Sequence, residues 1–193
     1  MSFRTVLLFG QPGSGKGTQG KILGMVPGFF HCACGEVFRN LRLDSELGNV
    51  FAQYSSQGQL VPDEPTLQLW SQFIDSSQTA GRFNPATDTL ILDGIPRNVN
   101  QAEMLRETLD VRAVCHLTCP VREKLVERLQ RRALRENRLD DANLEVIRSR
   151  LETYERDTKP VLDHYGPALC HAVDATQTPV RVLQDLLAIL ARI

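Results

Sequence analysis

The sequence has no long apolar run and no excess of charge of either sign, and each absence argues against a class of protein. None of its hydrophobic segments approaches the ~20 residues that a membrane-spanning helix needs, so we expect no membrane association. A formal net charge of −1 argues against general nucleic-acid binding, which favours a basic surface. The first expected strand begins at Thr5, which leaves no room for a signal peptide. We therefore expect a cytoplasmic protein.

The cysteines are few, and their spacing forms no disulfide framework. Their number is odd and they are scattered, so we interpret all of them as free thiols: Cys32, Cys34, Cys115, Cys119 and Cys170. Two of them flank Ala33 next to His31, but structural zinc needs four close ligands and no second pair lies nearby. We expect no zinc. What remains is a chain of 193 residues, 42% hydrophobic, long enough for one domain over residues 1–193.

Short apolar segments alternate with segments of helical period along most of the chain. The expected strands cover residues 5–9, 29–30, 89–92, 111–117 and 168–173. Between them, sets such as Leu144, Ile147, Leu151 and Tyr154 repeat with the spacing of one helical face. This order predicts an α/β fold, a three-layer sandwich with a five-stranded parallel sheet between helices. In such folds ligands bind at the carboxyl ends of the strands.

Two intervals break the alternation, and we expect both to be mobile inserts. Residues 34–64 contain helices with no strand between them, and residues 132–140 are polar and rich in arginine. In the first insert, one helix is expected to end near Leu43 and another to start at Asp44 and Ser45. Gly58 has the position of a C-terminal helix cap.

A glycine-rich loop follows the first expected strand and predicts a nucleoside triphosphate site of the P-loop class. Its sequence is Gly10-Gln11-Pro12-Gly13-Ser14-Gly15-Lys16-Gly17-Thr18. The glycines let the backbone turn its N–H groups inward, and Lys16 opens a helix whose N-terminus favours an anion. The usual hydroxyl ligand for Mg²⁺ directly after the lysine is replaced by Gly17. We therefore expect no direct protein ligand to the metal, which phosphates and water would hold.

The third expected strand ends in a carboxylate, within the run Leu90-Ile91-Leu92-Asp93-Gly94-Ile95-Pro96-Arg97. An isolated aspartate there is as often a turn former. Beside a phosphate loop, Asp93 is interpreted as the group that orients water on Mg²⁺. Gly94 allows close approach of a ligand, and Pro96 stiffens the turn that directs Arg97 across the cleft.

Arginines are concentrated between residues 128 and 138. Arg128, Arg131, Arg132, Arg135 and Arg138 could be solvated charge, because Glu123, Glu127 and Glu136 lie among them. We favour phosphate binding, since guanidinium groups stabilise the charge that spreads over a phosphoryl group in transfer. Arg39, Arg97 and Arg150 are expected to join them. The pair Asp140 and Asp141 either caps a helix that begins near Ala142 or holds these arginines.

Taken together, the motifs resemble the adenylate kinases of the short-lid type over almost the whole chain. The resemblance implies reversible, Mg²⁺-dependent phosphoryl transfer from ATP to AMP giving two ADP, with residues 34–64 as the insert that binds the monophosphate and 132–140 as the lid. It implies catalytic roles for Lys16, Asp93, Arg97, Arg132, Arg138 and Arg150. It assigns ATP binding to Gly13, Ser14, Gly15, Lys16, Gly17, Thr18, Arg128, Arg132 and Gln177. It assigns AMP binding to Cys34, Arg39, Gln59, Leu60, Val61, Gly94, Ile95, Pro96, Arg97, Gln101, Arg138 and Arg150.

Four departures from the family pattern bear on these roles. Cys34 stands where adenylate kinases commonly carry threonine, and Glu36 replaces the usual aspartate. The spacing after Asp141 is one residue longer than usual, which leaves Arg148 as an alternative to Arg150. The lid lacks the four cysteines of the long, zinc-bearing form.

Three other functions remain open from the sequence. A UMP/CMP kinase shares the loop and the lid but would carry asparagine in place of Gln101. A non-catalytic module that senses adenylates would have lost one or more arginines, and a nucleic-acid-stimulated ATPase is disfavoured by the short chain and neutral charge. We expect a monomer whose partners are ATP, AMP and ADP, with no nucleic acid.

Overall fold

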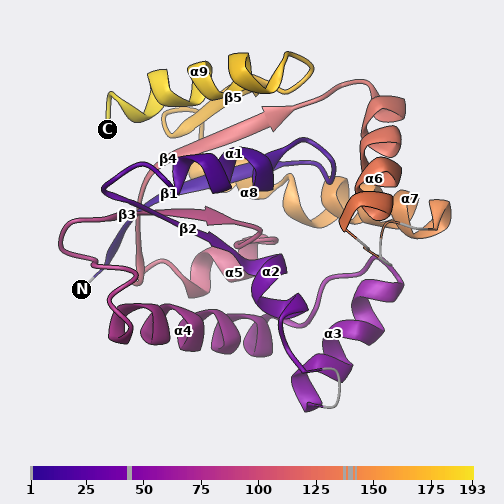
Figure 1. Ribbon diagram of the computed structural model, residues 1–193, viewed down its shortest axis with the longest axis horizontal. Helices are drawn as coiled ribbons and strands as arrows, with labels where there is room; N and C mark the ends of the chain where they lie inside the picture. Colours follow the sequence, from indigo (N-terminus) through magenta and orange to yellow (C-terminus); the bar gives the residue numbers. More distant parts are fainter. Residues whose placement is uncertain (1, 43–44, 137, 139–140, 142) are drawn as a thin grey trace.

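The computed structural model describes the whole chain except residues 1, 43–44, 137, 139–140 and 142 (Figure 1). Its centre is a five-stranded parallel sheet in the order β2-β3-β1-β4-β5. The strands are β1 (Phe3–Gly10), β2 (Phe29–Ala33), β3 (Thr89–Asp93), β4 (Leu109–Thr118) and β5 (Cys170–Asp174). The expected α/β fold and its strand number are thereby confirmed.

Helices connect the strands and cover both faces of the sheet. They are α1 (Lys16–Leu23), α2 (Cys34–Arg39), α3 (Glu46–Ser56), α4 (Asp63–Thr79), α5 (Val99–Met104), α6 (Arg122–Glu136), α7 (Leu144–Thr153), α8 (Val161–Tyr165) and α9 (Pro179–Leu190). A π-helical turn, Tyr154–Thr158, continues α7. Among the described residues, no helix has both the length and the apolar character that crossing a bilayer would require.

Two apolar cores lie on opposite sides of the sheet because successive side chains of a strand point to opposite faces. Val6 and Leu8 of β1 pack in one core, with helices α1, α6, α7 and α9. Leu7 and Phe9 of the same strand pack in the other core, with α2, α4, α5 and α8. Figure 1 shows α9 and α4 on opposite sides of the sheet. The central strand is thus buried on both faces, as its continuous apolar sequence predicts.

The first insert follows the expected pattern with one difference. Helix α2 ends at Arg39, earlier than the expected end near Leu43, because Asn40 already closes its last turn. Leu43 and Asp44 lie outside the described residues. Ser45 caps α3 as expected, since its hydroxyl accepts a hydrogen bond from the backbone N–H of Gly48 at 3.1 Å. Gly58 follows the end of α3 with a φ of +71°, the left-handed conformation expected after a helix.

The second insert begins on a helix. Helix α6 continues to Glu136, so the first residues of the expected lid, 132–136, form its last turn. Helix α7 starts at Leu144 and not near Ala142, because the side chain of Asn143 accepts from the backbone N–H of Glu145 at 2.8 Å. In the connection between α6 and α7, the structure describes Arg138, Asp141 and Asn143.

Candidate active site

A cleft of about 590 Å³ opens at the carboxyl ends of β1 and β3. The phosphate loop, both inserts and the end of β5 all contribute to its walls. Of the site residues predicted from the sequence, every one lines this cleft except Ile95. The side chain of Ile95 is buried in the apolar core beneath the loop that carries Gly94 and Arg97.

The phosphate loop lies against β4 and α6 and admits no larger residues at two of its glycines. A Cβ on Gly10 would lie 2.5 Å from the carbonyl oxygen of Leu117, and one on Gly13 would lie 2.9 Å from that of Leu125. Both glycines have positive φ, 143° and 83°. Helix α1 starts at Lys16, within this loop, and Lys16, Gly17 and Thr18 line the cleft, so the N–H groups of its first turn are available to an anion.

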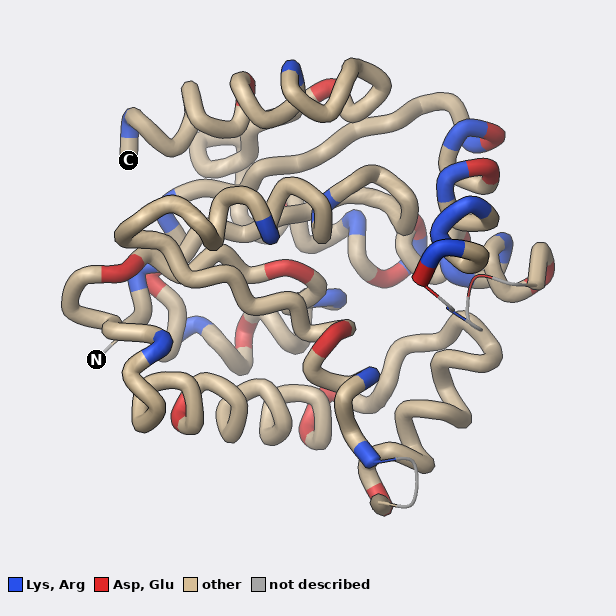
Figure 2. Tube along the Cα trace, in the orientation of Figure 1, with Lys and Arg blue, Asp and Glu red and all other residues tan. Residues whose placement is uncertain are grey.

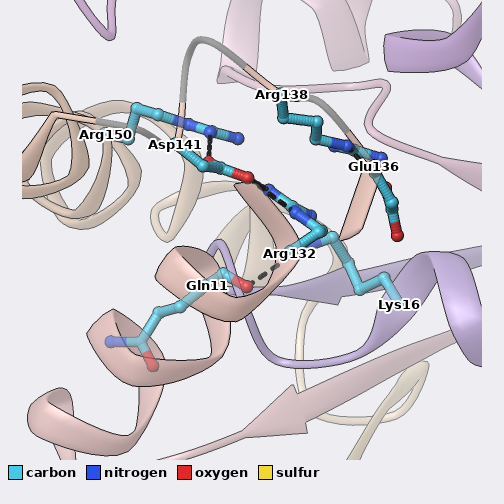
Figure 3. A network of polar contacts seen from close by, with 7 residues as sticks. All are labelled: Gln11, Lys16, Arg132, Glu136, Arg138, Asp141 and Arg150. Atoms are coloured by element: carbon cyan, nitrogen blue, oxygen red, sulfur yellow. Dashed lines mark hydrogen bonds and ion pairs between the residues drawn. The ribbon is translucent and has the colours of Figure 1, made fainter. Parts of the chain in front are cut away.

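Lys16 reaches back over the loop into the cleft (Figure 3). Its ammonium group donates to the carbonyl oxygens of Gly10 at 2.6 Å and Gln11 at 3.2 Å. Burial lowers the pKa of Lys16 to about 8, against the opposing effect of Asp93. Nearby arginines, Arg97 first among them, contribute to this lowering of the pKa. The site therefore holds excess positive charge that a polyphosphate would neutralise.

Asp93 faces the phosphate loop from the end of β3. A Cβ on Gly17 would lie 3.7 Å from its Oδ2 atom, so the missing side chain at this position leaves the carboxylate open toward the loop. The hydroxyl of Ser14 is buried and has no hydrogen-bond partner among the described residues. No group of three or more potential metal-binding side chains occurs in the described part of the chain. The loop and Asp93 can thus contact a metal through phosphate and water.

Asp141 binds two of the arginines that the sequence assigned to catalysis (Figure 3). Its carboxylate is fully buried and lies 2.5 Å from Nη2 of Arg132, whose Nε donates to it at 2.7 Å. Arg150 forms an ion pair with the other oxygen. Of the two alternatives for the acidic pair, Asp141 therefore holds the arginines and does not cap α7. Asp140 lies outside the described residues.

Lysine and arginine residues recur along α6, as Figure 2 shows. Arg128, Arg131, Arg132 and Arg135 of this helix line the cleft. Arg128 donates to the carbonyl oxygen of Ala175 at 2.9 Å, which ties α6 to the end of β5. Arg131 forms an exposed ion pair with Glu127, the arrangement expected of solvated charge. Arg138 pairs with Glu136 at 2.7 Å. Arg150 lines the cleft, whereas Arg148 is not among the residues that do.

The far part of the cleft is formed by the first insert and the loop after β3. Cys34 is 2% exposed, and burial raises the pKa of its thiol to about 12, so the thiol is protonated at neutral pH. Arg97 donates from Nε to the carbonyl oxygen of Gly94 at 2.9 Å. The side chain of Gln101 accepts from the backbone N–H of Arg97 at 2.7 Å. Gln59, Leu60, Val61 and Arg39 line the same part.

Two polar arrangements near the cleft were not predicted from the sequence. Asp63 accepts hydrogen bonds from the side-chain amides of Asn98, Asn100 and Gln101, each at 2.8 Å. Tyr154 lines the cleft and its hydroxyl lies 3.1 Å from Nε2 of His116. The only available signal for Asp63 in the sequence was its place two residues after the stretch Gln59–Val61.

Comparison with known proteins agrees with this geometry. A family model described as "Adenylate kinase" matches residues 8–168. The chain is 37% identical over 166 residues to an adenylate kinase of Parabacteroides distasonis, covering 83% of each protein. It is 40% identical over 166 residues to one from Cyanothece sp., covering 83% of this chain and 80% of that protein. It is 32% identical over 188 residues to one from Flavobacterium psychrophilum, covering 94% of this chain and 95% of that protein. The chain therefore belongs to the adenylate kinase family, phosphotransferases that act between ATP and AMP.

Proposed function

We propose that the cleft binds ATP and AMP side by side and transfers the phosphoryl group directly between them. The observation that carries this proposal is that the phosphate loop lines one part of the cleft, and Gln101 with the loop after β3 lines another part. Arginines line the same cleft. ATP would lie over Gly13–Thr18, with its base near Arg128 and Gln177. AMP would lie between the first insert, Arg97 and Gln101. No covalent intermediate is required, because both nucleotides occupy the same cleft.

On the ATP side, backbone N–H groups of the loop and the Lys16 ammonium would hold the β- and γ-phosphates. The arrival of phosphate charge would raise the pKa of Lys16 from about 8, so the lysine stays charged during turnover. The residues present fit Mg²⁺ held indirectly, since Asp93 faces the loop across Gly17. Bound Mg²⁺ would neutralise phosphate charge. Asp93 would orient the water around that ion.

Between the nucleotides, Arg97, Arg132, Arg138 and Arg150 would stabilise charge on the transferring group. Guanidinium groups suit this task because they present several donors in a fixed plane. The buried Asp141 keeps Arg132 and Arg150 in place before substrate arrives. Closure of residues 34–64 and 132–140 over the substrates would exclude water and suppress hydrolysis of ATP.

The proposal includes a monomer that works in the cytoplasm on ATP, AMP and ADP, without nucleic acid. All five cysteines are free thiols, as a reducing compartment favours. Light scattering during size-exclusion chromatography tests the monomer: a mass of twice 21.6 kDa would contradict it.

The choice of AMP over UMP or CMP is tested by a transfer assay with MgATP and each monophosphate, scored by diphosphate formation. We expect strong turnover with AMP and at least about tenfold lower kcat/KM with UMP, CMP and GMP. A reaction without acceptor measures background hydrolysis. Preference for a pyrimidine would contradict the role of Gln101, and binding without transfer would favour the adenylate-sensing module.

A further inference from the structure

Asp63 connects the first insert to the wall that would read the acceptor base. It is the first residue of α4, and its partners come from the loop and helix that follow β3. Oδ1 accepts from the amide nitrogens of Asn98 and Gln101, and Oδ2 accepts from that of Asn100. Partial burial alone would raise the pKa of Asp63, but these hydrogen bonds lower it. The carboxylate is therefore ionised at neutral pH and acts only as an acceptor.

In two of these side-chain amides, those of Gln101 and Asn98, the oxygen atom accepts a hydrogen bond from a backbone N–H. Oε1 of Gln101 accepts from the N–H of Arg97 at 2.7 Å, and Oδ1 of Asn98 accepts from the N–H of Gln101 at 2.7 Å. A side-chain amide has nearly the same shape in both orientations, so only its partners decide which end carries the donor. Turning the Gln101 amide over would place NH₂ against the N–H of Arg97 and oxygen against the carboxylate. Both hydrogen bonds would be lost.

This fixed orientation has a consequence for the base in the cleft. These two hydrogen bonds use one hydrogen of Nε2 and one lone pair of Oε1. The Gln101 side chain can therefore still donate once from Nε2 and accept once at Oε1. A 6-aminopurine offers an amino donor next to a ring-nitrogen acceptor, which matches that pair. A 6-oxopurine offers a carbonyl acceptor next to a ring N–H donor, the reverse order. An amide free to turn over would match either base.

We propose that Asp63 is a positioning residue that fixes the amide of Gln101 and so selects 6-aminopurine over 6-oxopurine monophosphates. The inference rests on the proposed function, in which Gln101 contacts the acceptor base. Asp63 itself need not touch the nucleotide: it acts through Gln101.

The test compares kcat/KM for AMP with kcat/KM for inosine monophosphate, whose base differs from adenine at the 6-position. Asp63→Ala removes the acceptor, and Asp63→Ser replaces it with a hydroxyl that can accept or donate. Asp63→Asn retains an acceptor oxygen for Asn98 and Gln101. Glu64→Ala is the matched control, because this exposed carboxylate lies in the same first turn of α4.

We expect the AMP-to-IMP ratio to fall at least about tenfold in the Ala and Ser variants. It should stay near the wild-type value in Asp63→Asn and Glu64→Ala. Equal losses with both nucleotides, leaving the ratio unchanged in Ala and Ser variants that fold, would overturn the role of Asp63. A wild-type enzyme that prefers a pyrimidine monophosphate would instead overturn the proposed function, before any variant is compared.

Discussion

The buried charge of Lys16 lowers the stability of the native state, and it suits the phosphate binding that we propose. The ammonium group pairs with two carbonyl oxygens, yet its surroundings hold its pKa near 8, below the model-peptide value of 10.5. The unfolded chain therefore binds this proton more tightly than the native state does. The charged lysine costs native stability at all pH values below about 8, and the cost disappears as pH rises toward 10.5. Phosphate binding would offset this free-energy cost, because the negative charge of phosphate stabilises the charged lysine.

We predict that Lys16→Met inactivates the enzyme without destabilising it at pH 7. Turnover should fall by at least about a hundredfold, since a main donor to the phosphates is lost. Tm at pH 7 should equal or exceed that of the wild type by about a few degrees, and this advantage should shrink by pH 10. Thermal unfolding at both pH values checks it, with the exposed Lys124→Met on α6 as control. A clear loss of Tm at pH 7 would mean that the bonds to Gly10 and Gln11 outweigh the cost of burial.

The buried carboxylate of Asp141 joins α6 to the last turn of α7, because it pairs with Arg132 and Arg150. We predict that Asp141→Asn, nearly isosteric, lowers unfolding free energy by about 3 kcal/mol or more, because both arginines lose their charge partner. Turnover should fall by at least about tenfold as Arg132 and Arg150 lose alignment. Urea unfolding and steady-state kinetics measure the two effects. Glu127→Gln, which breaks only the exposed pair with Arg131, should cost less than about 1 kcal/mol. Similar costs for both variants would contradict the role of Asp141.

Elements with strong local signals were predictable from the sequence, and those defined by distant partners were not. The apolar runs located all five strands. Strand β2 was expected only at Phe29 and Phe30, and it extends through Ala33 because each of its residues pairs with β3. For Asp141, the sequence could not separate a helix cap from an ion pair, since both place a carboxylate at the same point. Asp63 was missed because its amide partners lie 35 to 38 residues further along the chain.

The first insert contacts α7, the helix that follows the second insert, at the end of α3, and the two helices lie close together in Figure 1. The hydroxyl of Ser149 donates to the carbonyl oxygen of Gln57 at 2.8 Å. A Cβ on Gly58 would lie 2.9 Å from the carbonyl oxygen of Val146 and 3.0 Å from the backbone nitrogen of Arg150. The backbone that carries Arg150, a partner of Asp141, thus packs on the end of the first insert.

We predict that Gly58→Ala disturbs this contact and weakens AMP binding as well as the fold. Gly58 and Gly81 have similar positive φ values, 71° and 68°, so alanine should cost about 1 kcal/mol of backbone strain at either site. Around Gly81 the described residues leave the Cβ position open within 4 Å, which makes Gly81→Ala the matched control. At Gly58 the clash with backbone of α7 should add about 1 to 3 kcal/mol. Urea unfolding measures the loss of unfolding free energy in each of the two variants. The KM for AMP should rise in Gly58→Ala and stay unchanged in Gly81→Ala. Equal costs and an unchanged KM would mean that the end of α3 does not pack on α7 in solution.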